Sequence, residues 1–213
     1  MARYPNVGSV KTRLGESLGH EEATNLYLCF LKDIIEKVNR LSVPFFIYFT
    51  PKNKMEDFEL LLGNNLTYVP QIGDDLNQIL YNGFRTSLKM GYNSSIALAS
   101  DIPDLPESIL NEAVLKLKTF DSVIGPSIDG GYYLIGLQKN AVRKNLFQGI
   151  TWSTEKVYAE TMNKIKEEKI SCYPLTPWGD VDVIDDLERL LSSKDSMFHR
   201  SHSWKYLKGV KLT

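Results

Sequence analysis

The apolar positions of this chain follow two alternating patterns. In the first, apolar residues recur every three or four positions, which places them on one face of a helix. This pattern covers residues 20–41 and 75–89. In the second, short aromatic and β-branched runs end at turn-forming residues, as buried strands do. Such runs predict strands over residues 43–49, 66–70, 95–100, 122–126, 132–137 and 170–175. Shorter helices are predicted over residues 53–62, 106–117, 154–168 and 183–192.

Strands that alternate with helices in this way predict βαβ units. We therefore expect an α/β, Rossmann-like fold with a mostly parallel central sheet and helices on both faces. The fully apolar run Ile96–Ala99 favours an interior position for strand 95–100. Neither a repeat nor a low-complexity linker interrupts the chain, so a single domain is expected over residues 1–192. An irregular polar tail is expected over residues 193–213.

The start of the chain departs from the usual α/β order. Such a domain normally begins with a buried strand, but here a basic loop with glycines and a proline covers residues 3–19. Met1 and Ala2 are too few to be expected to supply that strand. We therefore expect the first strand to be missing, or its place to be filled by another segment.

Composition narrows the function classes. The chain has 25 basic and 26 acidic residues and a net charge of −1, without the basic excess typical of nucleic-acid binders. No apolar run approaches the roughly 20 residues that span a bilayer, and no secretory signal pattern opens the chain. Cys29 and Cys172 are isolated, which favours reduced thiols in a cytoplasmic protein.

Acidic residues at predicted strand ends are candidates for a metal site. Asp101 directly follows strand 95–100, and ligands of open α/β sheets bind outside the carboxyl ends of strands. Asp180 and Asp182 precede a predicted helix, where capping would account for one acid but not for both. Mg²⁺ is commonly held by one or two carboxylates together with substrate phosphates. The alternative for Asp101 is a simple turn cap.

The basic loop is a candidate for phosphate binding. Gly8 would let the backbone approach a phosphate, and Lys11 and Arg13 would supply charge. Their spacing on an extended loop aims both side chains the same way. The pattern is not a P-loop, and basic loops are commonly just solvated.

A glycine-rich turn and a tryptophan complete the candidate residues. Gly130 and Gly131 permit a tight turn between the strands 122–126 and 132–137, and Asp129 precedes them. Trp152 has two explanations, as a surface that stacks on a sugar or as part of the core.

Several segments in order resemble one family. They are ARYPNVGSVKTRL, QIGDDLNQIL, ALASDIPDLP, VIGPSIDGGYYLIGL, LFQGITWST and GDVDVIDDLERL. They resemble the small transferases of the glycosyltransferase A-type (GT-A) fold that occur beside radical-SAM/selenodomain proteins, known as arsenosugar-biosynthesis glycosyltransferases. More distantly, the chain resembles nucleotidyltransferases of the 2-phospholactate guanylyltransferase type. The resemblance covers about residues 2–192 and implies a nucleotide-diphospho-sugar transferase fold.

The resemblance also implies roles for residues. It makes Gly8, Lys11, Arg13 and Asp75 nucleotide- or phosphate-binding residues, and Asp101 and Asp182 metal ligands. Two departures stand out: Val7 replaces the second proline of a Pro-x-Pro-Gly motif, and Val183-Ile184-Asp185 replaces Thr-Pro-Glu.

Three functions are compatible with these residues. The first is glycosyl transfer from a nucleotide-diphosphate sugar with Mg²⁺ or Mn²⁺, in which Gly130, Gly131 and Trp152 contact the acceptor or sugar. If the transfer inverts the anomeric configuration, Asp129 deprotonates the acceptor. The second is nucleotidyl transfer from a nucleoside triphosphate, with release of pyrophosphate. The third is an inactive nucleotide-binding or scaffold protein. The expected partners are a nucleotide sugar or triphosphate and a small-molecule acceptor, with a homo-oligomer as one possible state.

Overall fold

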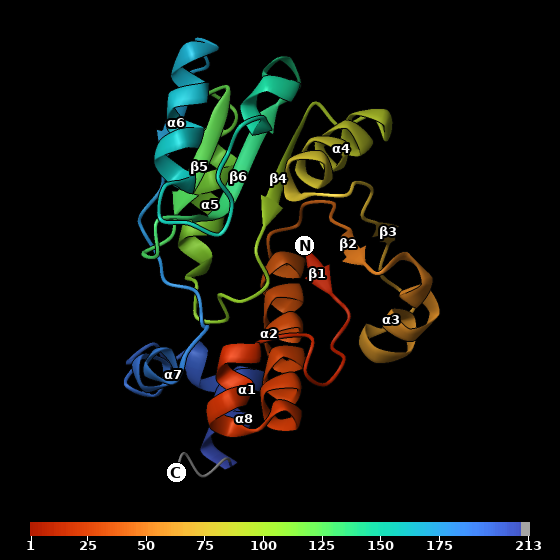
Figure 1. Ribbon diagram of the computed structural model, residues 1–213, viewed down its shortest axis with the longest axis vertical. Helices are drawn as coiled ribbons and strands as arrows, with labels where there is room; N and C mark the ends of the chain where they lie inside the picture. Colours follow the sequence, from red (N-terminus) through yellow and green to blue (C-terminus); the bar gives the residue numbers. More distant parts are fainter. Residues whose placement is uncertain (210–213) are drawn as a thin grey trace. The chain divides into compact units, whose positions relative to one another are not determined.

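The computed structural model describes residues 1–209 and divides into two compact units (Figure 1). The first unit comprises Met1–Pro70, Ser100–Leu105 and the chain from Asp180 onward. The second unit comprises Gln71–Ala99 and Pro106–Gly179. Within the described residues, no helix combines the length and apolarity needed to cross a bilayer.

The first unit contains a three-stranded parallel sheet with helices packed around it. Its strands are β1 (Ala2–Arg3), β2 (Ile47–Thr50) and β3 (Tyr68–Pro70), in that spatial order. Its helices are α1 (Thr12–Leu18), α2 (His20–Arg40), η1 (Lys52–Lys54), α3 (Met55–Leu62), α7 (Ile184–Leu191), η4 (Phe198–Arg200) and α8 (His202–Gly209).

Helix α2 is the central element of this unit. Glu21 and Glu22 in its first turn and basic residues in its last turn complement the helix dipole. Its apolar face includes Leu26 and Phe30, which are almost fully buried in one core with residues of the sheet and of α7 and α8. Both α1 and α8 pack against α2 (Figure 1). The periodicity predicted from the sequence over residues 20–41 is thus confirmed.

The second unit contains a four-stranded mixed sheet. Its strands are β4 (Ser94–Leu98), β5 (Ser122–Pro126), β6 (Tyr132–Gln138) and β7 (Cys172–Pro174), in the spatial order β4-β6-β5-β7. Strand β6 runs antiparallel to both β4 and β5, whereas β5 and β7 are parallel. The helices are α4 (Leu76–Lys89), α5 (Glu107–Lys116), η2 (Lys139–Ala141), η3 (Lys144–Phe147) and α6 (Val157–Glu167).

The predicted α/β class with mostly parallel strands is confirmed, because three of the five pairings within residues 1–209 are parallel. The predicted interior position of strand 95–100 is wrong. Strand β4 lies at one end of its four-stranded sheet, and Ile96 and Leu98 are only half-buried. The interior positions are taken by β6 and β5, and β6 pairs with both β4 and β5 after the Gly130–Gly131 turn. An apolar run indicates a hydrophobic strand, but it does not specify which strands lie beside it in the sheet.

The start of the chain corrects a second expectation. Ala2 and Arg3 do form a strand, paired with Phe49 and Thr50 of β2. The backbone N–H of Tyr4 continues this contact by donating to the carbonyl of Thr50 at 2.8 Å. Two residues are too few to show a period in the sequence, yet they suffice to place the following loop on the edge of the sheet.

The segment 193–213 is not an irregular tail throughout. Within its described part, η4 and α8 are helical, and Phe198 and Leu207 are buried in the core of the first unit. Residues 210–213 lie outside the described residues. The start of α8 is capped by Asp33 of α2, whose carboxylate accepts from the backbone N–H groups of His202 at 2.7 Å and Ser203 at 2.9 Å. Such a distant cap leaves no local sequence signal. The expectation of a single domain over residues 1–192 stays a prediction.

Candidate functional site

The loop before α1 holds a basic side chain in a fixed position. Gly8 has a φ of 76°, in the left-handed region that favours glycine. Ser9 donates its backbone N–H and its hydroxyl to the carbonyl of Asn6, and Val10 is buried in the core. Lys11 then caps α1 with φ 47° and ψ 47°, a conformation that non-glycine residues adopt rarely. The loop is therefore anchored on both sides of Lys11.

The ammonium group of Lys11 bridges two carboxylates. Its Nζ lies 2.6 Å from Oδ2 of Asp101 and 2.6 Å from Oδ1 of Asp182. The Lys11 side chain is only 6% exposed, so burial alone would lower the pKa of its ammonium. The charges and hydrogen bonds of the two carboxylates outweigh burial and raise that pKa above its ordinary value. Lys11 is thus a fixed positive charge in this site.

Arg13 adds a second positive charge at the same place. Its Nη2 lies 2.6 Å from Oδ2 of Asp182, on the opposite carboxylate oxygen from the one that Lys11 contacts. The Arg13 side chain is 67% exposed, so most of its guanidinium faces solvent. A guanidinium in that position can offer further N–H donors to an incoming anion.

A backbone hydrogen bond joins the segment that contains Asp101 to the segment 180–182. The N–H of Val181 donates to the carbonyl of Asp101 at 3.0 Å, and the Val181 side chain is fully buried. At the start of α7, the carboxylate of Asp186 accepts from the N–H groups of Asp182 and Val183 at 2.8 and 2.9 Å. Because Asp186 caps the helix, the side chain of Asp182 is left to contact Lys11 and Arg13.

Three carboxylates converge here. One oxygen each from Asp101, Asp180 and Asp182 lies within 4.8 Å of the other two. Like charges at this separation repel one another, and Lys11 and Arg13 offset part of that repulsion. A set of carboxylate oxygens also fits the preference of Mg²⁺ and Mn²⁺ for oxygen ligands. The donor set therefore suits the predicted metal, although the metal role itself stays a prediction.

A small polar cleft of about 270 Å³ in the first unit is lined by Lys11, Arg13, Asp101 and Asp182, and also by Tyr27 and Ser100. Sequence reasoning missed both of these. The Tyr27 hydroxyl lies 3.1 Å from Oγ of Ser100 and accepts from the backbone N–H of Arg3 at 3.2 Å. Burial raises the pKa of the Tyr27 phenol. Tyr27 lies on the apolar face of α2, so its pattern in the sequence is that of a core residue.

The glycine turn of the second unit is closely packed. The Asp129 carboxylate accepts from the N–H of Gly131 at 2.9 Å. Gly130 has a φ of 91°, and a Cβ there would lie 2.3 Å from the carbonyl oxygen of Glu155. Only glycine fits this close approach of the chain that leads into α6. Asp129 is exposed at the end of a defined turn.

Trp152 and Asp75 also belong to the second unit. The indole N–H of Trp152 donates to Oδ1 of Asn77 at 2.7 Å, and its ring meets Tyr132 edge-on at 6.0 Å between centroids. Asp75 is the N-cap of α4, where its Oδ1 accepts from the N–H of Gln78 at 2.8 Å. The structure thus brings together the predicted phosphate and metal residues Lys11, Arg13, Asp101 and Asp182 in one unit. The predicted residues Asp75, Asp129, Gly130, Gly131 and Trp152 lie in the other unit.

Solved structures share this fold. A crystal structure from Desulfovibrio desulfuricans G20, which carries the provisional name nucleotide-diphospho-sugar transferase, superposes with a TM-score of 0.94 at 34% identity, covering 98% of this chain and 91% of that one. A cytidylyltransferase from Leptospira borgpetersenii serovar Hardjo-bovis (strain JB197) superposes with a TM-score of 0.52 at 15% identity, covering 97% and 90% of the two chains. At that identity the second likeness concerns the fold alone.

Curated relatives are transferases as well. The 2-phospho-L-lactate guanylyltransferase of Methanocaldococcus infernus is 24% identical over 209 residues, which is 97% of this chain and 88% of the relative. The model of a family described as uncharacterized protein conserved in bacteria, DUF2064, matches residues 34–154. The chain therefore belongs to the DUF2064 family, and with this fold and these relatives it is a transferase.

Proposed function

We propose that this transferase moves a glycosyl group from a nucleotide-diphosphate sugar to a small acceptor, with Mg²⁺ or Mn²⁺ as cofactor. The observation that carries the proposal is the cluster in which Lys11 bridges Asp101 and Asp182 and Arg13 joins the same carboxylate. A diphosphate and its metal need both basic and acidic groups at one place, and this cleft has both. The relative that is 34% identical over nearly the whole chain supports a sugar nucleotide as donor.

The basic groups of the cleft would hold the diphosphate. Lys11 is buried and fixed, so it would supply a positive charge without first having to be ordered. Arg13 is exposed and would close on phosphate oxygens through its guanidinium fork. Asp101, Asp182 and Asp180 would hold the divalent cation, which would neutralise the charge that develops on the leaving diphosphate.

The residues that we assign to the acceptor belong to the second unit. In an inverting transfer, the acceptor oxygen forms a bond to the anomeric carbon while the bond from that carbon to the diphosphate oxygen breaks. Asp129 would take the acceptor proton, since its carboxylate is exposed; the Gly131 N–H fixes the position of that carboxylate at the turn. Gly130, Gly131 and Trp152 would contact the sugar or the acceptor, and Asp75 the nucleotide.

A second candidate is nucleotidyl transfer, which the curated guanylyltransferase relatives favour. In that reaction an acceptor phosphate or carboxylate oxygen attacks the α-phosphorus of a nucleoside triphosphate, and pyrophosphate leaves. The same basic groups and carboxylates would serve, since the charge again develops on a departing diphosphate.

A binding and turnover screen separates these functions. The purified protein would be tested by thermal shift with nucleotide sugars and with nucleoside triphosphates, each with Mg²⁺ or Mn²⁺, and with Asp101→Asn as a control. Stabilisation by a nucleotide sugar, together with release of nucleoside diphosphate, would support glycosyl transfer. Stabilisation by a triphosphate with release of pyrophosphate would favour nucleotidyl transfer. Stabilisation by neither class of nucleotide would contradict both and support an inactive scaffold.

A further inference from the structure

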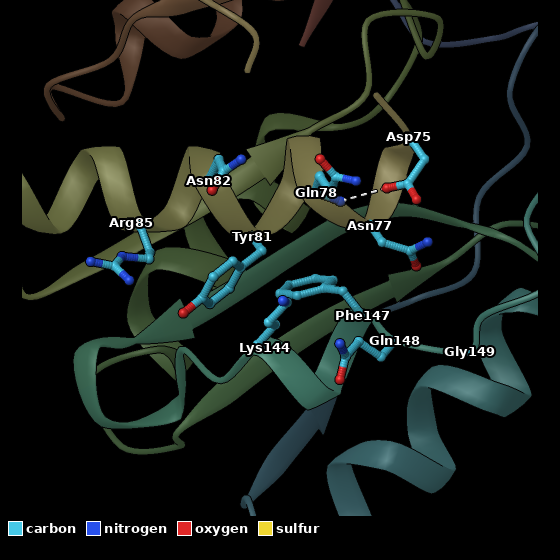
Figure 2. A pocket seen from close by; sticks show the side chains of 10 residues that line it. All are labelled: Asp75, Asn77, Gln78, Tyr81, Asn82, Arg85, Lys144, Phe147, Gln148 and Gly149. Carbon is cyan, nitrogen blue, oxygen red and sulfur yellow. Dashed lines mark hydrogen bonds between the residues drawn. The ribbon is translucent and has the colours of Figure 1, made fainter. Parts of the chain in front are cut away.

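A groove separate from the carboxylate cluster lies within the second unit. It has a volume of about 680 Å³ and runs between one face of α4 and the segment 144–149 (Figure 2). This volume is in the range of small-molecule sites in proteins. Every residue that lines the groove belongs to the second unit, so its shape depends on that unit alone.

Buried aromatic side chains form the floor of the groove. Phe147 is 1% exposed and stacks on the buried Phe84 of α4, with 5.9 Å between ring centroids and an interplanar angle of 19°. Tyr81, one turn before Phe84, is half-buried and presents its ring to the groove. Flat apolar surfaces of this kind bind the C–H face of a sugar ring.

One end of the groove is positively charged. Arg85 and Lys144 are both exposed and line the groove, and Figure 2 shows the Tyr81 ring between them. The Arg85 guanidinium lies 5.9 Å from the centroid of that ring, a cation–π contact that orients it. At the other end, the Asp75 carboxylate already accepts from the N–H of Gln78 as a helix cap. The charges therefore favour an anionic group at the Arg85 end.

The remaining lining is rich in side-chain amides. Asn77, Gln78 and Gln148 offer both donors and acceptors along the groove (Figure 2). The carbonyl oxygen of Asn77 already accepts from the Trp152 indole at 2.7 Å, which holds its NH₂ group in place as a donor. Amides suit the hydroxyl groups of a sugar, which are donors and acceptors at once.

We propose that this groove binds a small polyhydroxylated anion, a sugar phosphate or a sugar acid. Arg85 and Lys144 hold its anionic group, Tyr81 contacts its ring above the buried Phe147, and the amides of Asn77, Gln78 and Gln148 bind its hydroxyls. The site uses neither the carboxylate cluster nor a metal, and it shares with the proposed function only Asp75 and, through Asn77, Trp152. Phosphate and carboxylate groups are both anions that the two basic side chains can bind. A panel of probes distinguishes a sugar phosphate from a sugar acid.

The test is a titration of metal-free, nucleotide-free protein, followed by ¹H–¹⁵N NMR. Four probes are compared: glucose 1-phosphate, glucuronate, inorganic phosphate and neutral glucose. We expect one of the two sugar anions to shift the backbone signals of Tyr81, Arg85 and Gln148 and the indole signal of Trp152. The signals of the carboxylate cluster should not shift. Inorganic phosphate and glucose should each bind at least about tenfold more weakly than that sugar anion.

Variants then assign the binding to the basic side chains. Arg85→Gln and Lys144→Gln should each weaken the binding of the sugar anion by about tenfold or more. Lys89→Gln is the matched control, because Lys89 is exposed on the last turn of α4 and does not line the groove. It should change the affinity by less than about twofold. All three positions are exposed, and thermal unfolding would verify that each variant is folded.

Three results would overturn the proposal. The first is the absence of shifts at groove residues with every probe at millimolar concentration. The second is equal binding of inorganic phosphate and the sugar anions, since the ring and hydroxyl contacts would then contribute nothing. The third is an equal loss of affinity in Lys89→Gln, which would indicate that the anion is attracted by the positive charge of α4 as a whole. Asp101→Asn should bind the probe as the wild type does, so a failure of the proposed function leaves this test intact.

Discussion

Lys11 and Asp182 lie 171 positions apart in the sequence, yet the ammonium of one is 2.6 Å from a carboxylate oxygen of the other. The same ammonium contacts Asp101 at 2.6 Å, so a single buried side chain joins three distant segments of the first unit. A lysine in this position neutralises the carboxylates when no metal or nucleotide is bound. Its removal should therefore affect stability and cation binding together.

We expect Lys11→Met to lower the free energy of unfolding by about 2 kcal/mol, because it leaves two carboxylates without their buried counter-charge. The estimate is below the value for a fully buried pair, since both aspartates are partly exposed. Added Mg²⁺ should restore more stability in the variant than in the wild type. Urea unfolding with and without Mg²⁺ measures both effects. Lys54→Met is a control at a partly exposed pair with Asp57, and an equal Mg²⁺ response in both variants would contradict the interpretation.

Arg13→Ala should act on substrate binding and hardly on stability. The side chain is 67% exposed, and exposed ion pairs contribute little to folding. We expect the KM for the nucleotide to rise about tenfold, because a charge-assisted contact to phosphate is lost. Steady-state kinetics and thermal unfolding of the same preparation check both parts. An unchanged KM would remove Arg13 from the phosphate site.

The sequence allowed the position of Asp101 to be predicted better than its contacts. The apolar run before Asp101-Ile102-Pro103 predicts a carboxylate at a strand end. The motifs that resemble the transferase family indicated which other segments carry residues of the same site. The bridge by Lys11 could not be predicted, because it depends on a left-handed residue before α1 and on the Val181–Asp101 backbone contact. Tyr27 was hidden for a different reason: its helical spacing is that of a core residue.

Two features of the fold were missed because their causes are distant in sequence. The edge position of β4 follows from how β6 returns after the Gly130–Gly131 turn, which apolar periodicity does not encode. Helix α8 begins where Asp33 caps it across 169 positions, so the local sequence around His202 reads as polar and irregular. Local patterns predicted the elements, and long-range contacts decided their neighbours.

The cap of α8 gives a stability prediction. Asp33 is 2% exposed and accepts from the N–H groups of His202 and Ser203 and from the Ser203 hydroxyl. Asp33→Ala should lower the free energy of unfolding by about 1–3 kcal/mol, because buried donors lose their acceptor. Glu36→Ala is the matched control, since Glu36 contacts the side chain of His202 at an exposed site and should cost about 0.5 kcal/mol or less. Similar losses in chemical denaturation would contradict a specific role for the cap.

The thiol of Cys29 should react slowly in the folded protein. Burial, with a smaller effect from Asp33, raises the pKa of the Cys29 thiol from 9.0 to about 11. Because the thiolate is the nucleophile, only about 0.1% of the folded thiol is reactive at pH 8. Alkylation by iodoacetamide, followed by mass spectrometry, should be at least about tenfold slower in the folded than in the urea-unfolded chain. The rate should rise as the pH approaches 11.

The same shift has a consequence for stability. A thiol whose pKa is higher in the folded state holds its proton more tightly there. Its contribution to stability is therefore complete below pH 9.0 and is lost as the pH rises to about 11. Cys29→Ser should make unfolding less dependent on pH in that window. Rapid alkylation of folded Cys29 at neutral pH would refute the raised pKa.

Asp101→Asn tests the carboxylate cluster most directly. The substitution removes one negative charge but keeps an oxygen that can accept from Lys11, and Asp182 still pairs with that lysine. The fold should therefore survive, with a stability change of about 1 kcal/mol. Cation binding should weaken strongly, because one of three converging carboxylates is gone. We expect metal-dependent transfer to fall by about 100-fold or more, measured as initial rate against Mg²⁺ and Mn²⁺ concentration. Asp57→Asn, at a partly exposed pair distant in sequence from the cluster, should leave the rate unchanged. If Asp101→Asn kept the wild-type rate at every Mg²⁺ concentration, the acids at this cleft would serve only to hold Lys11 in place.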